Sequence, residues 1–192
     1  MPETPEELWE RVHEQLRVPT VHEWDTWPFD GDLSVRPLQP PLEQEAPRFG
    51  EGGVDCRRCA AADEDYLWTN EHWRLFAFEK PSGLPLVVLL ETREHFGEPG
   101  DLPDGLASEL GLLVVRIERA IRSLGELGRV HVCRWGDGGE HLHWWFIARP
   151  ARLPQLVGSF VAIWDDILPP TPEGIWRTDL AALRAALDGV DG

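Results

Sequence analysis

The chain has 192 residues, enough for one sizeable core, and its 34 acidic against 18 basic residues give a formal net charge of −16. Such an acidic surface repels nucleic-acid backbones and anionic membranes, which excludes both as general partners. No run of about 18 or more apolar residues occurs, so we expect no membrane-spanning segment. The acidic start Met-Pro-Glu is unlike a signal peptide, and three cysteines fit a reducing compartment, so the predicted location is cytoplasmic.

The first regular pattern begins at Thr4. Thr4 is a residue type preferred at the N-cap, Pro5 suits the first helical position, and Glu7 stands at the spacing of a capping box. Apolar residues then recur at helical spacing. The pattern predicts a short amphipathic helix over residues 5–17.

Residues 19–53 show little periodicity and much proline, glycine and charge. We expect an extended arm there, packed on the core through Trp24, Trp27 and Phe29, because their large apolar surfaces favour burial. The predicted division of the chain has three parts. They are an N-terminal helix and arm over 1–54, a core domain over 55–150 and a C-terminal helical extension over 151–192.

The predicted core domain combines short strands with one long helix. Five segments have the composition of strands, namely 66–69, 73–78, 84–90, 130–135 and 141–148. Apolar residues from Leu106 to Leu124 step by three and four, which predicts a long helix that ends at Gly125. Two further helices are expected near 153–164 and 173–188. Strands in meander order with one central helix predict an α+β fold built on an antiparallel sheet.

Cys56 and Cys59 form a CxxC pair, whose spacing lets two thiolates bind one Zn²⁺. The chain has no second CxxC, so the other two ligands of a tetrahedral site would be histidines, and His95 and His141 are the candidates. The alternative is a pair of reduced cysteines with unrelated histidines. Redox use of the pair is less expected, because no parallel βαβ pattern surrounds it.

His141 and His143 stand two apart at the start of a predicted strand. Side chains two apart in a strand share one face of the sheet. The two imidazoles can therefore bind a common metal ion, or one of them can act as a nucleophile. Trp145 continues the same face, where a third polar residue would complete the pattern.

The order of these motifs resembles the histidine triad (HIT) superfamily, including its galactose-1-phosphate uridylyltransferase branch. The resemblance covers about residues 55–150 and rests on four segments, which are Cys56-x-x-Cys59, Glu71-His72-Trp73-Arg74, Thr92-Arg93-Glu94-His95 and His141-x-His143. It implies a HIT-like antiparallel sheet with a long central helix, and His143 as the nucleophile toward a nucleotide α-phosphate. It also implies one Zn²⁺ held by Cys56, Cys59, His95 and His141.

Arg149 indicates the register of the histidine motif. Members of the short bacterial type carry an arginine four residues after the third motif position, and Arg149 stands four after Trp145. Trp145 then takes the third position in place of histidine or glutamine, and we expect Trp145 and Arg149 to contact the substrate. In the other register His141 would be the nucleophile, His143 the third position and Gly139 the first.

Two functions fit this sequence. One is a zinc-binding nucleotide hydrolase or nucleotidyltransferase that acts through His143 with a degenerate triad. The other is a catalytically inactive HIT-fold domain that binds a ligand or a protein. Trp145 favours the second, because an indole offers a phosphate one N–H and much bulk, and Glu140 adds negative charge nearby. The implied partners are a nucleotide or phosphorylated small molecule and a second copy of the chain in a homodimer.

Overall fold

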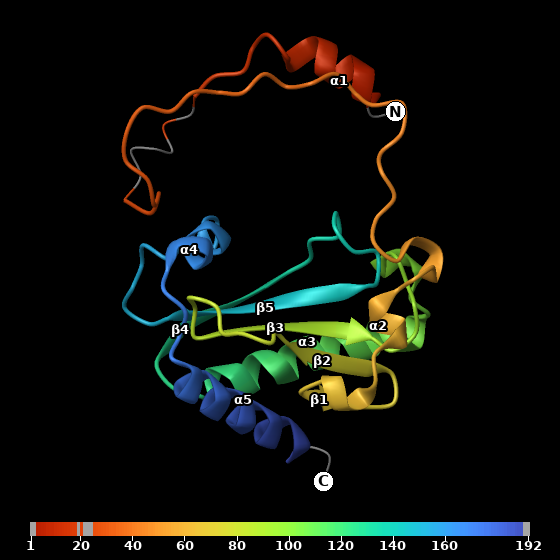
Figure 1. Cartoon of the computed structure of the whole chain (residues 1–192), viewed down its shortest axis with the longest axis vertical. Helices are drawn as coiled ribbons and strands as arrows, with labels where there is room; N and C mark the ends of the chain where they lie inside the picture. Colours follow the sequence, from red (N-terminus) through yellow and green to blue (C-terminus); the bar gives the residue numbers. More distant parts are fainter. Residues whose placement is uncertain (1–2, 19, 21–24, 190–192) are drawn as a thin grey trace. The chain divides into compact units, whose positions relative to one another are not determined.

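The computed structural model describes residues 3–18, 20 and 25–189, and the chain divides into two compact units, one up to Pro47 and one from Arg48 onward (Figure 1). The three-part division expected from the sequence stays a prediction. Among the described residues, no helix combines the length and the apolar character that crossing a bilayer requires.

The first unit contains helix α1 (Pro5–Val12). The predicted capping box is confirmed, because the Thr4 hydroxyl accepts a hydrogen bond from Glu7 N and the Glu7 carboxylate accepts one from Thr4 N. The helix ends earlier than the predicted residue 17. None of its residues is buried, so no packed face stabilises further turns beyond the capped start.

The aromatic residues of the arm were expected to pack on the core. Trp24 lies outside the described residues. Trp27 meets Phe29 edge-on with ring centroids 5.7 Å apart, and the Trp9 indole donates a hydrogen bond to the Leu38 carbonyl at 3.1 Å. These contacts lie within the first unit, so packing of the arm on the core stays a prediction.

The second unit is built on a five-stranded antiparallel sheet (Figure 1). Its strands are β1 (Trp68–Thr69), β2 (Trp73–Ala77), β3 (Leu86–Thr92), β4 (Leu127–Cys133) and β5 (His143–Pro150). They lie in the order β1-β2-β3-β5-β4, so the antiparallel α+β class is confirmed but the predicted meander order is wrong. The long helix after β3 carries the chain past one strand position, and β5 then returns between β3 and β4.

Helices α3 (Asp104–Arg122) and α5 (Glu173–Asp188) cover one face of the sheet, and α4 (Val161–Ile167) lies on the other side (Figure 1). Helix α4 begins later than the predicted residue 153, because Pro154 and Gly158 are poor helix formers and the segment around them forms turns. The remaining helical segments are short. They are α2 (Arg57–Ala60) and the 3₁₀ segments Glu51–Gly53, Asp63–Asp65 and Pro99–Asp101.

The sheet face under α3 and α5 forms the main core. Alternate strand residues meet the helices there, among them Trp73, Leu75, Leu86, Val88, Leu90 and Phe146 against Ile117, Ile121, Trp176 and Leu183. Each fully buried aliphatic or Phe side chain contributes about 1.5–3 kcal/mol. A slip of one residue would turn all of them to the wrong face, so this core fixes the register of β3 against β5. The intervening residues of both strands therefore face the opposite side, where the candidate site lies.

Candidate functional site

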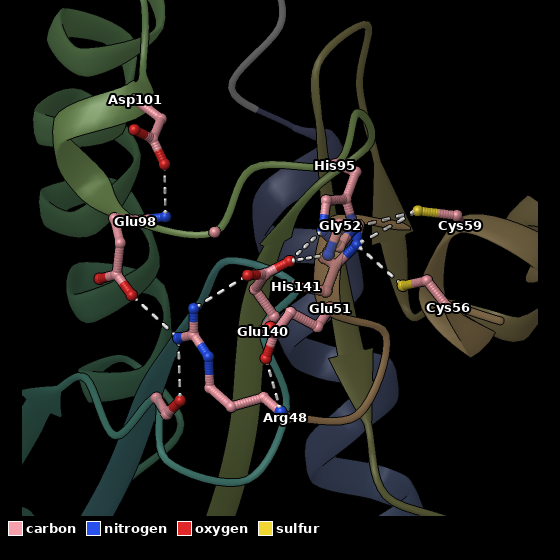
Figure 2. A network of polar contacts seen from close by, with 12 residues as sticks. Arg48, Glu51, Gly52, Cys56, Cys59, His95, Glu98, Asp101, Glu140 and His141 are labelled. Carbon is pink, nitrogen blue, oxygen red and sulfur yellow. Dashed lines mark hydrogen bonds and ion pairs between the residues drawn. The ribbon is translucent and has the colours of Figure 1, made fainter. Parts of the chain in front are cut away.

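Four side chains that can bind a metal ion meet at one corner of the sheet (Figure 2). Cys56 and Cys59 come from α2 and the residue before it, His95 follows β3, and His141 precedes β5. Their ligand atoms all lie within 4.8 Å of one another. The structure thus brings together the whole set that the sequence analysis selected.

The distances between these ligand atoms fit a tetrahedral zinc site. Zn–S bonds of about 2.3 Å and Zn–N bonds of about 2.0–2.1 Å at a tetrahedral angle place sulfur and nitrogen about 3.5 Å apart. The Cys56 Sγ lies 3.4 Å from His141 Nδ1, and the Cys59 Sγ lies 3.5 Å from Nδ1 of both His95 and His141. Two thiolates with two imidazoles are also a donor set that zinc prefers. The residues present therefore fit the metal that the motifs imply.

Hydrogen bonds aim both histidines at the cysteines. The His141 Nε2 lies 2.7 Å from the Thr92 carbonyl, which can only accept, so Nε2 carries the proton and Nδ1 keeps its lone pair. The His95 Nε2 lies 2.9 Å from the Glu140 carboxylate, which selects the same tautomer. Carbonyl and carboxylate partners of this kind orient metal-binding histidines and raise their basicity.

Burial changes the proton affinities of the cluster. It lowers the pKa of His141 to about 4, which keeps the imidazole neutral and able to ligate. Burial also lowers the pKa of His95, but its hydrogen bond to the Glu140 carboxylate and its interaction with Cys56 together outweigh burial, so the pKa of His95 is raised overall. Burial and the neighbouring Cys56 raise the pKa of Cys59 to about 11. A divalent cation among these atoms would favour both thiolates.

The Glu140 carboxylate links the cluster to the loop that begins the second unit (Figure 2). It accepts hydrogen bonds from Gly52 N at 2.6 Å and from the Arg48 guanidinium at 3.0 Å. Arg48 also pairs with Glu98 at 2.9 Å. From the sequence, Glu140 was expected to add negative charge near the substrate, but in the structure Arg48 and His95 face its carboxylate and compensate that charge.

Arg74 on β2 holds the cysteine segment against the sheet. Its guanidinium donates to the carbonyls of Arg58 and Ala61 at 3.2 and 3.3 Å, and its Nε lies 3.2 Å from the Asp63 carboxylate. These bonds position α2 through its backbone. The burial of Cys56 therefore depends on tertiary contacts as well as on the CxxC spacing.

His143 lies beside the cluster and lines a cavity of about 630 Å³, together with Arg57, Arg58, Glu91 and Trp145 among others. The His143 Nδ1 lies 2.8 Å from the His141 carbonyl. A carbonyl only accepts, so Nδ1 carries the proton and Nε2 of the neutral ring keeps a lone pair. No described residue forms a hydrogen bond with this Nε2. His143 therefore has the tautomer that a nucleophile requires.

Trp145 lines this cavity and also a second one of about 750 Å³. It stacks on Phe78 with centroids 5.7 Å apart and meets Trp135 at 5.5 Å. Its indole nitrogen is buried and has no hydrogen-bond partner among the described residues. Trp145 thus supplies aromatic surface to both cavities, while its buried indole N–H is not exposed to a ligand.

Glu91 and Arg58 are site residues that the sequence analysis missed. Glu91 is 1% exposed, and its carboxylate lies 3.2 Å from Arg58 Nε and accepts a hydrogen bond from the Tyr66 hydroxyl at 3.1 Å. Burial raises the pKa of Glu91 to about 7, against the opposing effect of Arg58. A glutamate that directly follows the apolar run of β3 was the available signal, because such a residue is rarely buried without a partner.

The basic residues singled out from the sequence lie elsewhere. Arg149 donates to the Leu153 carbonyl at 2.8 Å and does not line the cavity of His143. Arg149 stands six positions after His143 on β5, a distance of about 20 Å along the strand. Arg134 is held by the Gly97 carbonyl at 2.9 Å and the Glu98 carboxylate at 2.8 Å.

Comparison with known proteins finds similar folds among solved structures. No family model and no curated protein match the sequence. Among solved structures, a histidine triad protein from Bradyrhizobium japonicum matches with TM-score 0.52 and 19% identity, over 64% of this chain and 91% of that one. A hypothetical histidine triad nucleotide-binding protein from Sulfolobus tokodaii matches with TM-score 0.53 and 15% identity, over 71% and 94%.

A uridylyltransferase also aligns, with TM-score 0.49 and 17% identity, over 74% of this chain and about half (48%) of that one. The two histidine triad structures above share the antiparallel α+β architecture described here at low sequence identity. The chain therefore has the fold of the histidine triad superfamily, as the order of its sequence motifs predicts.

Proposed function

We propose that this protein is a zinc-binding HIT-fold enzyme that hydrolyses or transfers nucleotidyl groups through His143. The observation that carries the proposal is the hydrogen bond from His143 Nδ1 to the His141 carbonyl, which leaves Nε2 as a lone-pair donor at the wall of a cavity. The nucleotide-binding description of the matching Sulfolobus tokodaii protein supports the same ligand class. A homodimer and a cytoplasmic location belong to the proposal as well.

The reaction has two steps. The His143 Nε2 attacks the α-phosphorus, an N–P bond forms, and the P–O bond to the leaving group breaks with its electron pair staying on that oxygen, which takes up a proton. Water or an acceptor hydroxyl then attacks phosphorus, the N–P bond breaks, and the nucleoside monophosphate or its ester is released. The Nδ1–H bond holds the ring in place during both steps.

Cys56, Cys59, His95 and His141 would hold Zn²⁺ beside this reaction centre. All four positions of a tetrahedral ion would be taken by protein, so zinc would supply structure rather than a site for substrate. The ion would fix α2 and the start of β5 to each other. Those two segments provide Arg58 and His143, so the shape of the cavity depends on the metal site.

The test is to trap the intermediate. We expect the purified chain, incubated with a nucleoside diphosphate sugar, to acquire one nucleotidyl group that is stable to alkali and labile to acid, as a phosphoramidate is. His143→Ala should abolish the adduct. His72→Ala is the matched control, because His72 is an exposed histidine outside this cavity and should leave the adduct unchanged.

A catalytically inactive, ligand-binding HIT domain is the second candidate. Trp145 favours it, since an indole cannot take part in proton exchange as a histidine can. The two candidates give opposite results in the trapping experiment. Absence of adduct in the wild-type chain, with normal zinc content, would favour the binding domain.

A further inference from the structure

The buried carboxylate of Glu91 and the partly exposed guanidinium of Arg58 form an ion pair in the wall of the cavity that His143 lines. A carboxylate that is only 1% exposed is costly to desolvate, and the pairing with Arg58 and the Tyr66 hydroxyl offsets that cost only in part. Core packing does not require an ionisable group at this position, because an apolar residue would fill the same space at the end of an apolar strand. Core packing therefore does not explain the pair, which indicates a function of the pair in the cavity.

The geometry of Arg58 gives the role. Its Nε faces Glu91 at 3.2 Å, and its guanidinium carbon lies 3.9 Å from the centroid of the Phe76 ring. These two contacts fix the plane of the guanidinium. No described residue bonds to its terminal nitrogens, and the side chain is 32% exposed. A guanidinium held at Nε, with both terminal NH₂ groups free, is arranged to bind two oxygens of one phosphate.

The position relative to His143 completes the argument. Glu91 and His143 are directly opposite each other on β3 and β5, and both line the same cavity as Arg58. Side chains at opposite positions of an antiparallel pair have Cβ atoms about 4.5–5.5 Å apart. A phosphate within reach of His143 Nε2 is therefore close to the Glu91–Arg58 pair.

The cavity also lacks other fixed cations. Trp145 replaces the polar third position of the motif, and Arg149 and Arg134 bond elsewhere. Attack on a phosphate needs positive or N–H groups on the oxygens where charge develops. Besides Arg58, the cavity lining holds only Arg57 as a cation among the described residues, and Arg57 has an exposed side chain.

We propose that Arg58, oriented by Glu91 and Phe76, binds the anionic oxygens of a phosphate ester whose phosphorus lies at His143. The inference rests on the proposed function for the identity of the reacting atom, but the binding itself does not. The aromatic wall of Phe78 and Trp145 borders the same cavity and suits the apolar or aromatic part of the ester. Arg58 touches the substrate in this proposal, and Glu91 is a positioning residue.

The first experiment measures binding without turnover. The zinc-loaded full chain is titrated calorimetrically with AMP, with inorganic phosphate and with adenosine at constant ionic strength. We expect Arg58→Gln to weaken binding of AMP and phosphate about 10- to 100-fold and to leave adenosine unchanged. Arg57→Gln removes the same charge from the neighbouring residue and should weaken binding less than threefold. Arg58→Lys keeps the charge without the planar fork and should recover only part of the loss.

The second experiment isolates the positioning role of Glu91. Glu91→Gln and Glu91→Leu remove the same negative charge, but only glutamine keeps an oxygen that can face Arg58 Nε. We expect the glutamine variant to bind phosphate at least as well as the wild-type chain and the leucine variant to bind it several-fold more weakly. A merely structural role would lower the melting temperature of both variants without separating their phosphate affinities.

The outcomes decide the proposal separately from the reaction. Equal losses in the Arg57 and Arg58 variants would overturn it, as would a wild-type chain that binds neither AMP nor phosphate. Specific phosphate binding through Arg58 in a chain that forms no adduct on His143 would support the anion site and refute the proposed catalysis.

Discussion

The metal corner and the neighbouring cavity differ in how their polar groups are satisfied. At the corner, His95, His141 and Glu140 each have a hydrogen-bond partner, and the network closes through Arg48 (Figure 2). In the cavity wall, the terminal nitrogens of Arg58 have no partner among the described residues. A closed network is typical of a structural site, whereas unused donors on a cavity wall are typical of a binding site. The two regions are neighbours along the chain: His141, just before β5, belongs to the metal corner, and His143, the first residue of β5, lines the cavity.

The largest effect on stability should come from removing one ligand of the metal cluster. Cys56→Ser removes a buried thiolate from the cluster, and because metal-binding energy is partly folding energy, we expect a loss of at least about 3 kcal/mol in the free energy of unfolding. Metal analysis should find about one zinc per wild-type chain and much less in the variant. Cys133→Ser is the control, because Cys133 lies on β4 outside the cluster and should leave the zinc content unchanged.

Chelation checks the same point without a substitution. Removal of zinc from the wild-type chain should lower its melting temperature to near that of the Cys56 variant, and added zinc should restore it. A metal-free chain that melts at the original temperature would contradict a structural zinc site.

The next effect concerns the pH dependence of stability at Glu91. Its pKa is raised by burial from an ordinary 4.5 to about 7 in the folded state, so the folded chain binds more protons than the unfolded chain between these values. The contribution of Glu91 to stability is therefore largest at low pH, declines as pH rises, and is fully lost above about pH 7. Between pH 5.5 and 8, the wild-type chain should lose about 2 kcal/mol relative to Glu91→Gln.

Denaturant unfolding of the two chains at several pH values measures this difference. The comparison cancels the effect of protons on the metal ligands, because both chains keep the same cluster. A constant difference across this range would mean that Glu91 titrates normally despite its burial.

A smaller effect should follow from loosening the corner without removing a ligand. Glu140→Gln keeps the shape of the side chain but removes the charge that the His95 ring faces at 2.9 Å. Such partners of metal-binding histidines are worth about 10- to 100-fold in metal affinity. Competition with a chromogenic chelator measures the zinc affinity. Glu98→Gln is the control. Glu98 contacts Arg48 and not a metal ligand, so this variant should lower the zinc affinity less than threefold.

The two regions also differ in how far the sequence predicted them. The four residues of the candidate metal cluster follow from the CxxC spacing and from one residue after β3 and one before β5. Local motifs in the right order were therefore enough to select Cys56, Cys59, His95 and His141. Strands and the long helix followed from periodicity in the same way. The meander order failed because periodicity identifies strands without saying which ones pair, and β5 pairs with β3 only in three dimensions.

The residues of the cavity wall could not be predicted without knowing how the strands pair. Arg58 lies on a four-residue helix and Glu91 on a strand, and their contact depends on how Arg74 anchors α2 to the sheet. No sequence spacing connects the two residues. Arg149 was selected by its distance from Trp145 along the chain, yet the strand carries it away from His143. Which side chains meet in such a site depends on tertiary contacts, and sequence motifs alone do not predict these.

The last prediction tests whether Trp145 or the rest of the cavity limits the reaction. Trp145→His and Trp145→Gln restore a polar third position beside His143, and glutamine is the matched control because it cannot exchange a proton at neutral pH. If Arg58 already supplies the main contact to the phosphate, a polar third position adds one further hydrogen bond, and we expect the rate of adduct formation to rise only about three- to tenfold in both variants. Rapid-quench measurement of the phosphoramidate gives this rate. A rise of a hundredfold or more in the histidine variant alone would instead identify proton exchange at the third position as the missing function, and would reduce Arg58 to an accessory contact.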